Sequence, residues 1–424
     1  MVGVALSPEG RLRHLEAVPP ERDDAWGPWP DPDWTVLFEA AGLDPAGFRP
    51  VEPVWSPPTY ADSRGAWVGE FPGEPKIPIR IEAAAYRGKP VSFRIVLPWI
   101  RPGGTEALKN PWERVSQALL IVVWIAILLG GLLIARKNLL LGRGDRKGAS
   151  RLAVFVFVML ETRWIINTTH VPESSELDRF IVGIAFNLFI TSMAWIFYLA
   201  LEPYLRRLWP EMIVSWVRLL DGRIRDPLVG RDFLIGLLAG AVIMLAGHLF
   251  WLVAGWLGIP PLRPDQLTGP PIDIQMITLR GFRWWIGLLF NGAAAALVIP
   301  MGFTILLLLT KLLLRRQSLV IVGVLVVFSL LNVAAGDSPW MSLAFSCVIG
   351  LLYLILLFRF GLLAAVVAEF FIGLVFTYPM TLDFSSWYAG STALVLVVFA
   401  AMAVYGFSVS LAGRPIFHED LLRD

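Results

Sequence analysis

Long apolar segments constrain this chain more than any other feature. Runs such as 118–135 and 234–257 are close to the roughly 20 residues that a helix needs to cross a hydrocarbon core about 30 Å thick. They are too long for buried strands, which usually have about 3–10 residues. Only 17% of the residues are charged, against roughly 25% in soluble domains. The sequence therefore predicts a polytopic α-helical membrane protein.

The apolar segments divide into nine predicted spans. We place these spans at about 117–135, 152–168, 180–201, 233–257, 284–313, 318–335, 341–358, 361–379 and 390–411. The second span is interrupted by Glu161 and Arg163, so its boundaries are the least secure. The fifth span contains Pro300, which predicts a tilted or kinked helix because proline removes a backbone hydrogen bond.

The N-terminal region differs in composition from the rest. Residues 1–114 contain 18 of the 31 prolines and no apolar run of span length. Alternating residues around short turns predict one hairpin from 2–6 and 11–18 and a second from 77–86 and 91–97. Asp33 is placed to cap a short helix over 33–41. We therefore predict a small soluble α+β domain, followed by a helical bundle over 115–411 and a tail at 412–424.

Basic residues gather in alternate loops. The loop 136–151 is rich in lysine and arginine, and the loop 202–232 carries Arg206, Arg207, Arg218, Arg223, Arg225 and Arg231. Loops rich in these residues face the cytoplasm. The intervening loops near 172–178, 335–340 and 381–386 contain neither residue type, although the loop 258–283 carries three arginines. Nine spans then place the tail inside and the N-terminal domain outside.

This orientation raises a difficulty at Met1. The first residues lack the basic start and apolar core of a signal peptide, yet about 115 residues would have to cross the membrane ahead of the first span. Either an earlier membrane anchor belongs to a longer protein of which this chain is a part, or the span count is wrong by one. We favour the longer protein.

Particular stretches resemble a known family. VGVALSPEGRLRHLEAVPP, WTVLFEAAGLDPAGFRPVEPVWSPPTYADSRGAW and IRIEAAAYRGKPVSF resemble the extracytoplasmic segment of certain large bacterial serine/threonine protein kinases. ARKNLLLGRGDRKGASRLA and LEPYLRRLWPEMIVSWVRLLDGRIRDPLVGRD resemble the first two inner loops of these proteins. The resemblance implies a place in the bacterial cytoplasmic membrane and a cytoplasmic kinase domain or kinase partner.

The motifs of catalysis are absent from the sequence. A kinase needs a glycine-rich loop, a strand lysine, a His-Arg-Asp sequence and an Asp-Phe-Gly sequence, and none of these occurs. The four histidines form no His-Glu-x-x-His pair, there is no Gly-x-Ser-x-Gly elbow, and the single cysteine, Cys347, lies in an apolar run. We predict no catalytic, cofactor or metal site. A net charge of +2 does not favour nucleic acid as a partner.

Polar residues within the spans are the strongest candidates for function, because each costs a few kcal/mol unless it is paired or hydrated. Glu369 lies near the middle of the eighth span. It is predicted either to hydrogen-bond across the bundle, with Asn291, Asn332 or Ser346 as partners, or to bind a cation or relay a proton. Glu161 and Arg163 lie two residues apart and so on different faces of a helix; Glu161 is expected to face the bundle and Arg163 to extend outward.

The largest inner loop contains a second candidate. In residues 204–227, apolar side chains alternate with arginines, a pattern typical of an amphipathic helix that lies along the inner interface. It acts either as an anchor or as an element that couples the bundle to a cytoplasmic partner. Our leading hypothesis is a non-catalytic membrane sensor or anchor module. The alternative is a secondary transporter or channel that uses Glu369, and an intramembrane enzyme is the least favoured class.

Overall fold

The computed structural model describes residues 2–7, 10–22, 24, 29–71, 74–98, 111–257, 277–332 and 339–413. The chain forms two compact units, Met1–Ala107 and Leu108–Asp424, and each is described by itself. The predicted tail, with His418, lies outside the described residues beyond 413.

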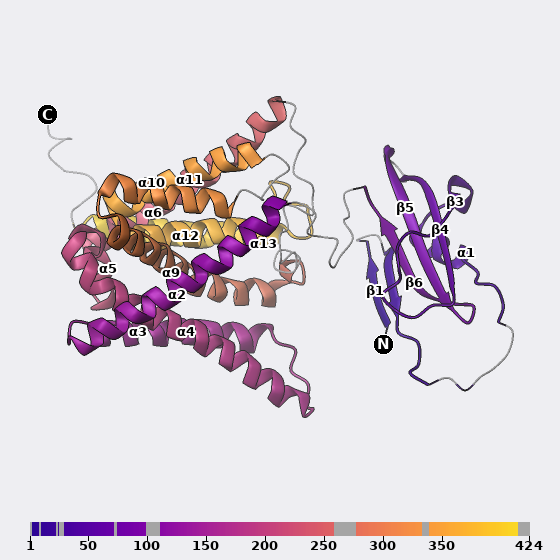
Figure 1. The fold of residues 1–424 in the computed structure, drawn as a ribbon, viewed down its shortest axis with the longest axis horizontal. Helices are drawn as coiled ribbons and strands as arrows, with labels where there is room; N and C mark the ends of the chain where they lie inside the picture. Colours follow the sequence, from indigo (N-terminus) through magenta and orange to yellow (C-terminus); the bar gives the residue numbers. More distant parts are fainter. Residues whose placement is uncertain are drawn as a thin grey trace, which may run out of the picture. The chain divides into compact units, whose positions relative to one another are not determined.

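The N-terminal unit is built on a six-stranded antiparallel sheet (Figure 1). Its strand order is β1-β2-β6-β5-β4-β3, with β1 at Val2–Leu6, β2 at Leu12–Ala17, β3 at Arg49–Val51, β4 at Ser63–Phe71, β5 at Glu74–Tyr86 and β6 at Lys89–Val96. Both predicted hairpins are present, as β1–β2 and β5–β6. Strands β3 and β4 were not predicted from the sequence, nor was the pairing of β2 with β6.

One helix covers a face of this sheet. Helix α1, Thr35–Ala41, buries Phe38, whose ring meets the Trp67 ring edge-on with 5.2 Å between the ring centres. Phe93 of β6 belongs to the same core and is fully buried. Asp33 lies just before the helix, and its carboxylate accepts a hydrogen bond from the Thr35 N–H at 3.0 Å. Burial of these aromatic side chains stabilises the packing of the helix against the sheet.

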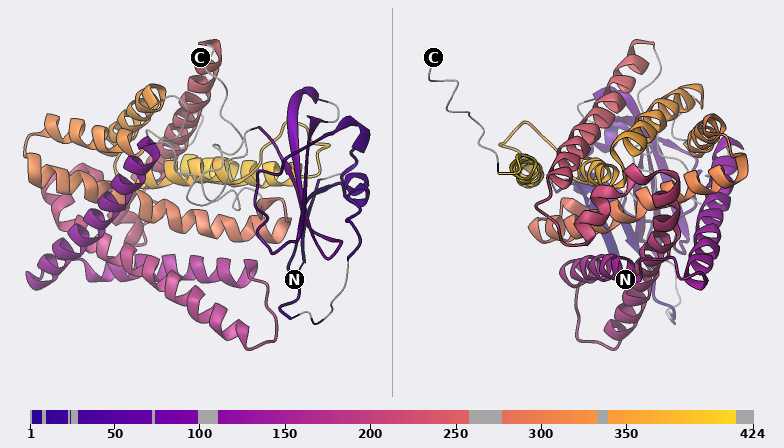
Figure 2. Two further views of the ribbon diagram at one scale, coloured as in Figure 1. Left: turned by 45° about the vertical axis from the view of Figure 1, so that its right-hand side comes forward. Right: turned by 90° about the vertical axis from the view of Figure 1, so that its left-hand side faces the viewer.

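The second unit is a bundle of long helices (Figures 1 and 2). They are α2 at Pro111–Leu140, α3 at Arg146–Asn167, α4 at Ser175–Leu208, α6 at Pro227–Trp256, α9 at Phe282–Leu314, α10 at Gln317–Leu331, α11 at Pro339–Phe360, α12 at Leu362–Thr377 and α13 at Ala389–Ser410. Each of the nine predicted segments falls mostly or wholly within one of these helices. The chain is thus a mostly helical protein of the polytopic membrane type.

Not all of these helices have the length and composition of a membrane span. Within the described residues, six do: α2, α4, α6, α9, α11 and α13. Helix α3 carries Arg151, Glu161 and Arg163. Helices α10 and α12 have 15 and 16 residues, which rise only about 23 Å at 1.5 Å per residue. The structure therefore supports six spans by length and composition rather than nine.

Helix α9 is the most buried of the six and contacts α2, α3, α4, α10 and α12. Met301, Ile305 and Leu308 on this helix have no exposed surface. Pro300 lies within α9, and Thr304 donates a hydrogen bond from its hydroxyl to the Pro300 carbonyl at 2.7 Å. The helix therefore continues through the proline as a single element around which the other helices pack.

Candidate functional site

The segment between α4 and α6 is the candidate coupling element. The expected long amphipathic helix over 204–227 is not formed. Helix α4 runs to Leu208, a short 3-10 turn follows at Pro210–Met212, and α5 is limited to Val214–Leu220. Proline at 210 cannot continue a helix, and Gly222 has a positive φ of 83° that suits the residue after a helix end. We call residues 209–226 the inner segment.

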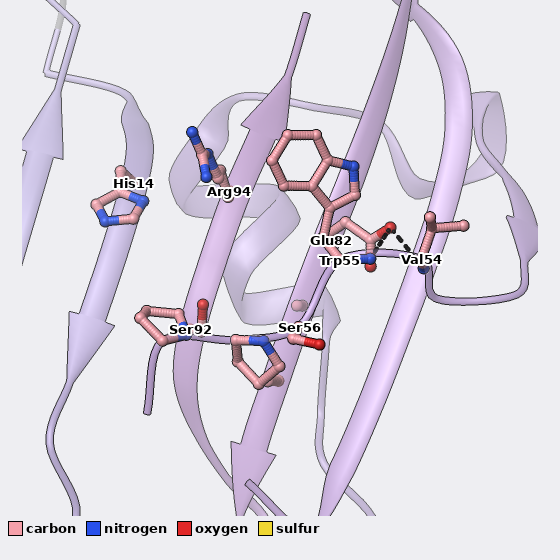
Figure 3. Close-up of a pocket in the computed structure, with 11 residues that line it drawn as sticks. His14, Val54, Trp55, Ser56, Glu82, Ser92 and Arg94 are labelled. Carbon is pink, nitrogen blue, oxygen red and sulfur yellow. Dashed lines mark hydrogen bonds between the residues drawn. The ribbon is translucent and has the colours of Figure 1, made fainter. Parts of the chain in front are cut away.

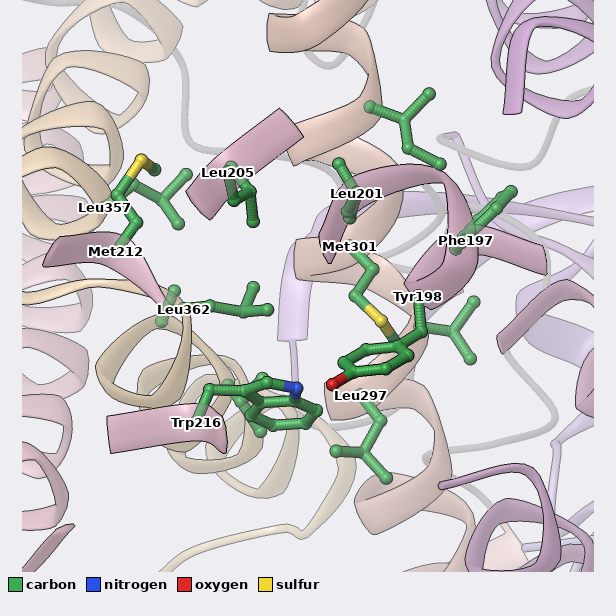
Figure 4. Close-up of a cluster of buried hydrophobic side chains, with 14 of the residues drawn as sticks. Phe197, Tyr198, Leu201, Leu205, Met212, Trp216, Leu297, Met301, Leu357 and Leu362 are labelled. Carbon is green, nitrogen blue, oxygen red and sulfur yellow. The ribbon is translucent and has the colours of Figure 1, made fainter. Parts of the chain in front are cut away.

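The inner segment is built into the bundle, and it does not lie along its edge. Met212, Ile213 and Trp216 are only 1–2% exposed and belong to the main apolar core. The segment contacts α3, α4, α6, α11 and α12. Figure 4 shows Met212 beside Leu357 and Trp216 turned into the same cluster. The apolar side chains of the inner segment, which were predicted to lie along the membrane interface, therefore pack against five helices.

A glycine brings the turn between α11 and α12 onto this segment. Gly361 has φ 91°, a backbone conformation that only glycine adopts readily. A Cβ atom at this position would lie 2.6 Å from the Met212 carbonyl oxygen, well inside contact distance. The segment and the α11–α12 turn are thus in direct backbone contact.

The six arginines named from the sequence lie at the same end of the bundle, in the last turn of α4 (Arg206, Arg207), in α5 (Arg218), in the turn before α6 (Arg223, Arg225) and in α6 (Arg231). Three of them form ion pairs, Arg206 with Glu202, Arg218 with Asp226 at 2.8 Å and Arg231 with Asp232 at 2.9 Å. The other three, Arg207, Arg223 and Arg225, are exposed.

Asp226 holds the end of the inner segment and the start of α6 together. Its carboxylate caps α6 by accepting the Leu228 N–H at 3.0 Å, and it also accepts hydrogen bonds from Arg218. Burial opposes the charged form, but these hydrogen bonds outweigh it, so the pKa of Asp226 lies below its usual value. The segment is thereby fixed by charge at one end and by apolar packing at the other.

The two acids that the sequence places within predicted spans have very different surroundings. Glu161 faces the bundle, as expected, and accepts a hydrogen bond from the buried Asn187 amide of α4 at 3.1 Å. The Arg163 Nε atom is buried and has no hydrogen-bond partner among the described residues. Glu369 makes no hydrogen bond to any described residue. The Tyr353 hydroxyl of the neighbouring helix α11 is also buried without a hydrogen-bond partner among the described residues.

The predicted hydrogen bonds of Glu369 to neighbouring amides are therefore not formed. Asn332 is the C-cap of α10 and donates to the Phe328 carbonyl at 2.8 Å within its own helix. Asn291 is half-buried on α9, and Ser346 is buried on α11, without a hydrogen bond to the acid. Sequence position alone could not show which faces of α9, α10 and α12 meet.

The sheet domain contains a pocket that the sequence analysis did not find. It has a volume of about 560 Å³, with walls from β2, β5, β6 and the loop 54–58. Glu82 is 7% exposed and accepts the N–H groups of Val54 and Trp55 at 3.1 and 3.4 Å, which fastens the loop to the sheet (Figure 3). The Arg94 guanidinium lies 5.0 Å from the centre of the Trp55 ring. The feature of the sequence that could have indicated this pocket is Glu82, an acid within the mostly apolar predicted strand 77–86.

Metal binding has no support in the described part of the chain, where no group of three or more His, Cys, Asp and Glu side chains is placed to hold an ion. A scan against protein-family models, a search of curated proteins and a search of solved structures find no match to this chain.

Proposed function

We propose that this chain is a non-catalytic membrane sensor or anchor module, related to receptor-type bacterial serine/threonine kinases, that passes a signal from the bundle to the cytoplasm through the inner segment. In this proposal all nine long helices are membrane-embedded, the sheet domain is outside and the arginine-rich loops face the cytoplasm. The observation that carries it is the burial of Met212, Ile213 and Trp216 among five helices beside exposed arginines.

Such a segment is suited to transmission. Packed cores switch between discrete arrangements and do not deform gradually, so a shift of α11 or α12 would move Met212 through its contact with Gly361. The exposed guanidinium groups of Arg207, Arg223 and Arg225 would move with the segment. Guanidinium groups bind carboxylates and phosphates, the groups that an acidic or phosphorylated partner surface presents. A kinase domain, in the same protein or beside it, is the partner that the sequence resemblance suggests.

The proposal can be tested at the inner segment. In a Cys347→Ser background, a spin label at Asp221→Cys, an exposed position of the inner segment, should become more mobile when Trp216→Ala removes the anchoring side chain. Trp256→Ala is the matched control, because Trp256 is 82% exposed and should leave the label unchanged. In the organism that carries the gene, Trp216→Ala should alter protein phosphorylation as strongly as deletion of the gene. Unchanged phosphorylation in both strains would contradict the kinase relation.

The alternative, transport or conduction, has one observation in its favour. Glu369 is a partly buried acid without a hydrogen-bond partner among the described residues, and the Tyr353 hydroxyl of the neighbouring helix α11 is likewise buried without a partner. Intramembrane acids of this kind mark ion and proton pathways. In liposomes, Glu369→Gln should then change the flux of a cation or of protons while Trp216→Ala does not. If the native protein carries no flux of any ion tested, this alternative fails.

A further inference from the structure

An apolar cavity lies at the basic end of the bundle. It has a volume of about 570 Å³, within the roughly 300–1,000 Å³ of small-molecule sites. Side chains from α3, α5, α6, α9, α12 and α13 line it, among them Leu152, Phe155, Trp216, Leu297, Val366 and Phe370. Except for Arg151, its lining residues are apolar or aromatic, which suits a hydrocarbon chain better than a polar solute.

The one charged residue of the cavity lies where it meets a basic surface. Arg151 lines the cavity and also a neighbouring hollow formed with Arg146, Lys147, Ser150 and Val154. Arg151 donates a hydrogen bond from one terminal nitrogen to the Leu220 carbonyl at 2.8 Å. A guanidinium has five N–H donors, so this bond fixes the group and leaves donors for an anion. Three cations thus line a hollow that shares Arg151 with the apolar cavity.

The cavity also borders a surface suited to lipid. Val154 and Phe155, one turn beyond Arg151 on α3, are 62% and 47% exposed. Residues three and four apart lie on the same helix face, so apolar side chains adjoin the basic group on the outside of the bundle. A phospholipid has the same order of parts, an anionic head group and then a hydrocarbon chain.

A buried donor at the cavity lacks an acceptor. The Trp216 side chain is 1% exposed, and its indole N–H has no hydrogen-bond partner among the described residues. Figure 4 shows the ring nitrogen turned towards the side on which the Tyr198 hydroxyl and Leu297 lie, and Leu297 also lines the cavity. An unsatisfied buried donor is costly, and nearly all are paired in native proteins. The ester carbonyl of a lipid is an acceptor located between head group and chain.

We propose that this cavity binds one acyl chain of an anionic phospholipid, with the phosphate at Arg151, Arg146 and Lys147 and an ester carbonyl at the Trp216 N–H. The site goes beyond the proposed function, because lipid binding requires no signal and no partner. Trp216 and Leu220 belong to the inner segment, so a bound chain would also contact that segment.

Native mass spectrometry of the purified full chain in detergent tests the proposal. Phosphatidylglycerol should bind more tightly than phosphatidylcholine with the same chains. Arg151→Gln should weaken phosphatidylglycerol binding about fivefold, since one basic residue near an anionic lipid contributes about that factor. Arg207→Gln is the matched control and should leave binding unchanged, because Arg207 is an exposed arginine at the same end but outside the cavity. Equal binding of both lipids, or equal effects of both variants, would overturn the head-group assignment.

Two further measurements distinguish binding of the acyl chain from binding of the phosphate group. A phosphatidylglycerol with a photoreactive group near the end of its acyl chain should label peptides of α9 or α12 in the native protein, and labelling confined to other helices would overturn the site. Ala293→Leu, which narrows the cavity, should reduce that labelling while the thermal midpoint shows that the variant is folded. If millimolar inorganic phosphate displaces the lipid completely, the site recognises phosphate alone and the lipid assignment is wrong.

Discussion

The sheet domain and the helical bundle each contain a contact that is typical of the medium in which it folds. In the sheet domain a buried carboxylate, Glu82, gathers two backbone N–H groups and the Arg80 side chain at 2.6 Å. In the bundle, Gly236 and Gly240 of α6 allow close approach to α12, because a Cβ at either position would lie within 3 Å of α12 atoms. Water drives apolar surfaces together around a soluble core, but in lipid that force between helices is absent and close van der Waals contact replaces it.

The largest loss of stability is expected at Gly236, where a substitution tests whether close helix contact stabilises the bundle. A Cβ there would lie 2.6 Å from the Ala364 carbonyl oxygen and 2.6 Å from the Val367 Cβ. Both neighbours belong to α12, so Gly236→Val must separate the two helices. We expect a loss of about 3 kcal/mol or more, at the upper end of overpacking effects. The thermal midpoint of the purified protein in detergent should fall by several degrees.

Gly255 provides the control for this substitution within the same helix. A Cβ atom at Gly255 would meet nothing within 4 Å, so Gly255→Val changes side-chain size and helix propensity in the same way without the clash. Its midpoint should stay within about a degree of the native value, since exposed substitutions usually change stability by less than ~0.5 kcal/mol. Equal losses in both variants would show that glycine at 236 matters for a reason other than packing.

The second effect concerns Glu82 and should be confined to the sheet domain. Glu82→Ala leaves the N–H groups of Val54 and Trp55 without their acceptor, and loss of such a partner costs about 1–3 kcal/mol. Hydrogen exchange at these two amides should accelerate more than tenfold, whereas amides of α9 should not change. Glu70→Ala is the control, because Glu70 is an exposed acid on β4. Equal acceleration in both variants would contradict a special role for the buried carboxylate.

The two regions also differ in how far the sequence predicts them. The nine predicted apolar segments coincide with nine helices in the described part of the chain, because a helix satisfies its own backbone hydrogen bonds and needs only a local pattern. Adjacent hairpins such as β5–β6 were predicted for the same reason. The pairing of β2 with β6, which joins Leu15 to Phe93, depends on residues far apart in the chain and was not predicted.

The candidate sites were predicted less well than the helices, for a related reason. Arginine positions in the inner segment were evident from the sequence, and so was the isolation of Glu369 among apolar neighbours. What the sequence did not indicate was contact between elements: the carbonyl of Met212 against Gly361, or Arg151 beside an apolar cavity whose walls come from six helices. Hydropathy identifies which segments are buried but carries no information on which faces meet.

The smallest change in stability is expected at His170, whose positive charge stabilises a turn outside the apolar part of the bundle. His170 lies in the turn between α3 and α4, with Nδ1 2.5 Å from Glu176 Oε1 and Nε2 3.0 Å from the Ile165 carbonyl oxygen. Both partners accept hydrogen bonds, so only the doubly protonated ring can donate to both. The bond to Glu176 and then that to Ile165 raise the pKa of His170, although Arg283 opposes the positive charge.

The pH dependence of this turn follows from the direction of the shift. A pKa that is higher in the folded state stabilises the turn fully below the unfolded value near 6.5, and the contribution is lost as pH rises through the folded pKa. Hydrogen exchange at residues 168–174, corrected for the intrinsic rate, should therefore increase above neutral pH. His170→Gln should remove this pH dependence, and His248→Gln on α6 should not. If the pH dependence of exchange persists in His170→Gln, another group titrates. Protonation of His170 would then not stabilise this turn.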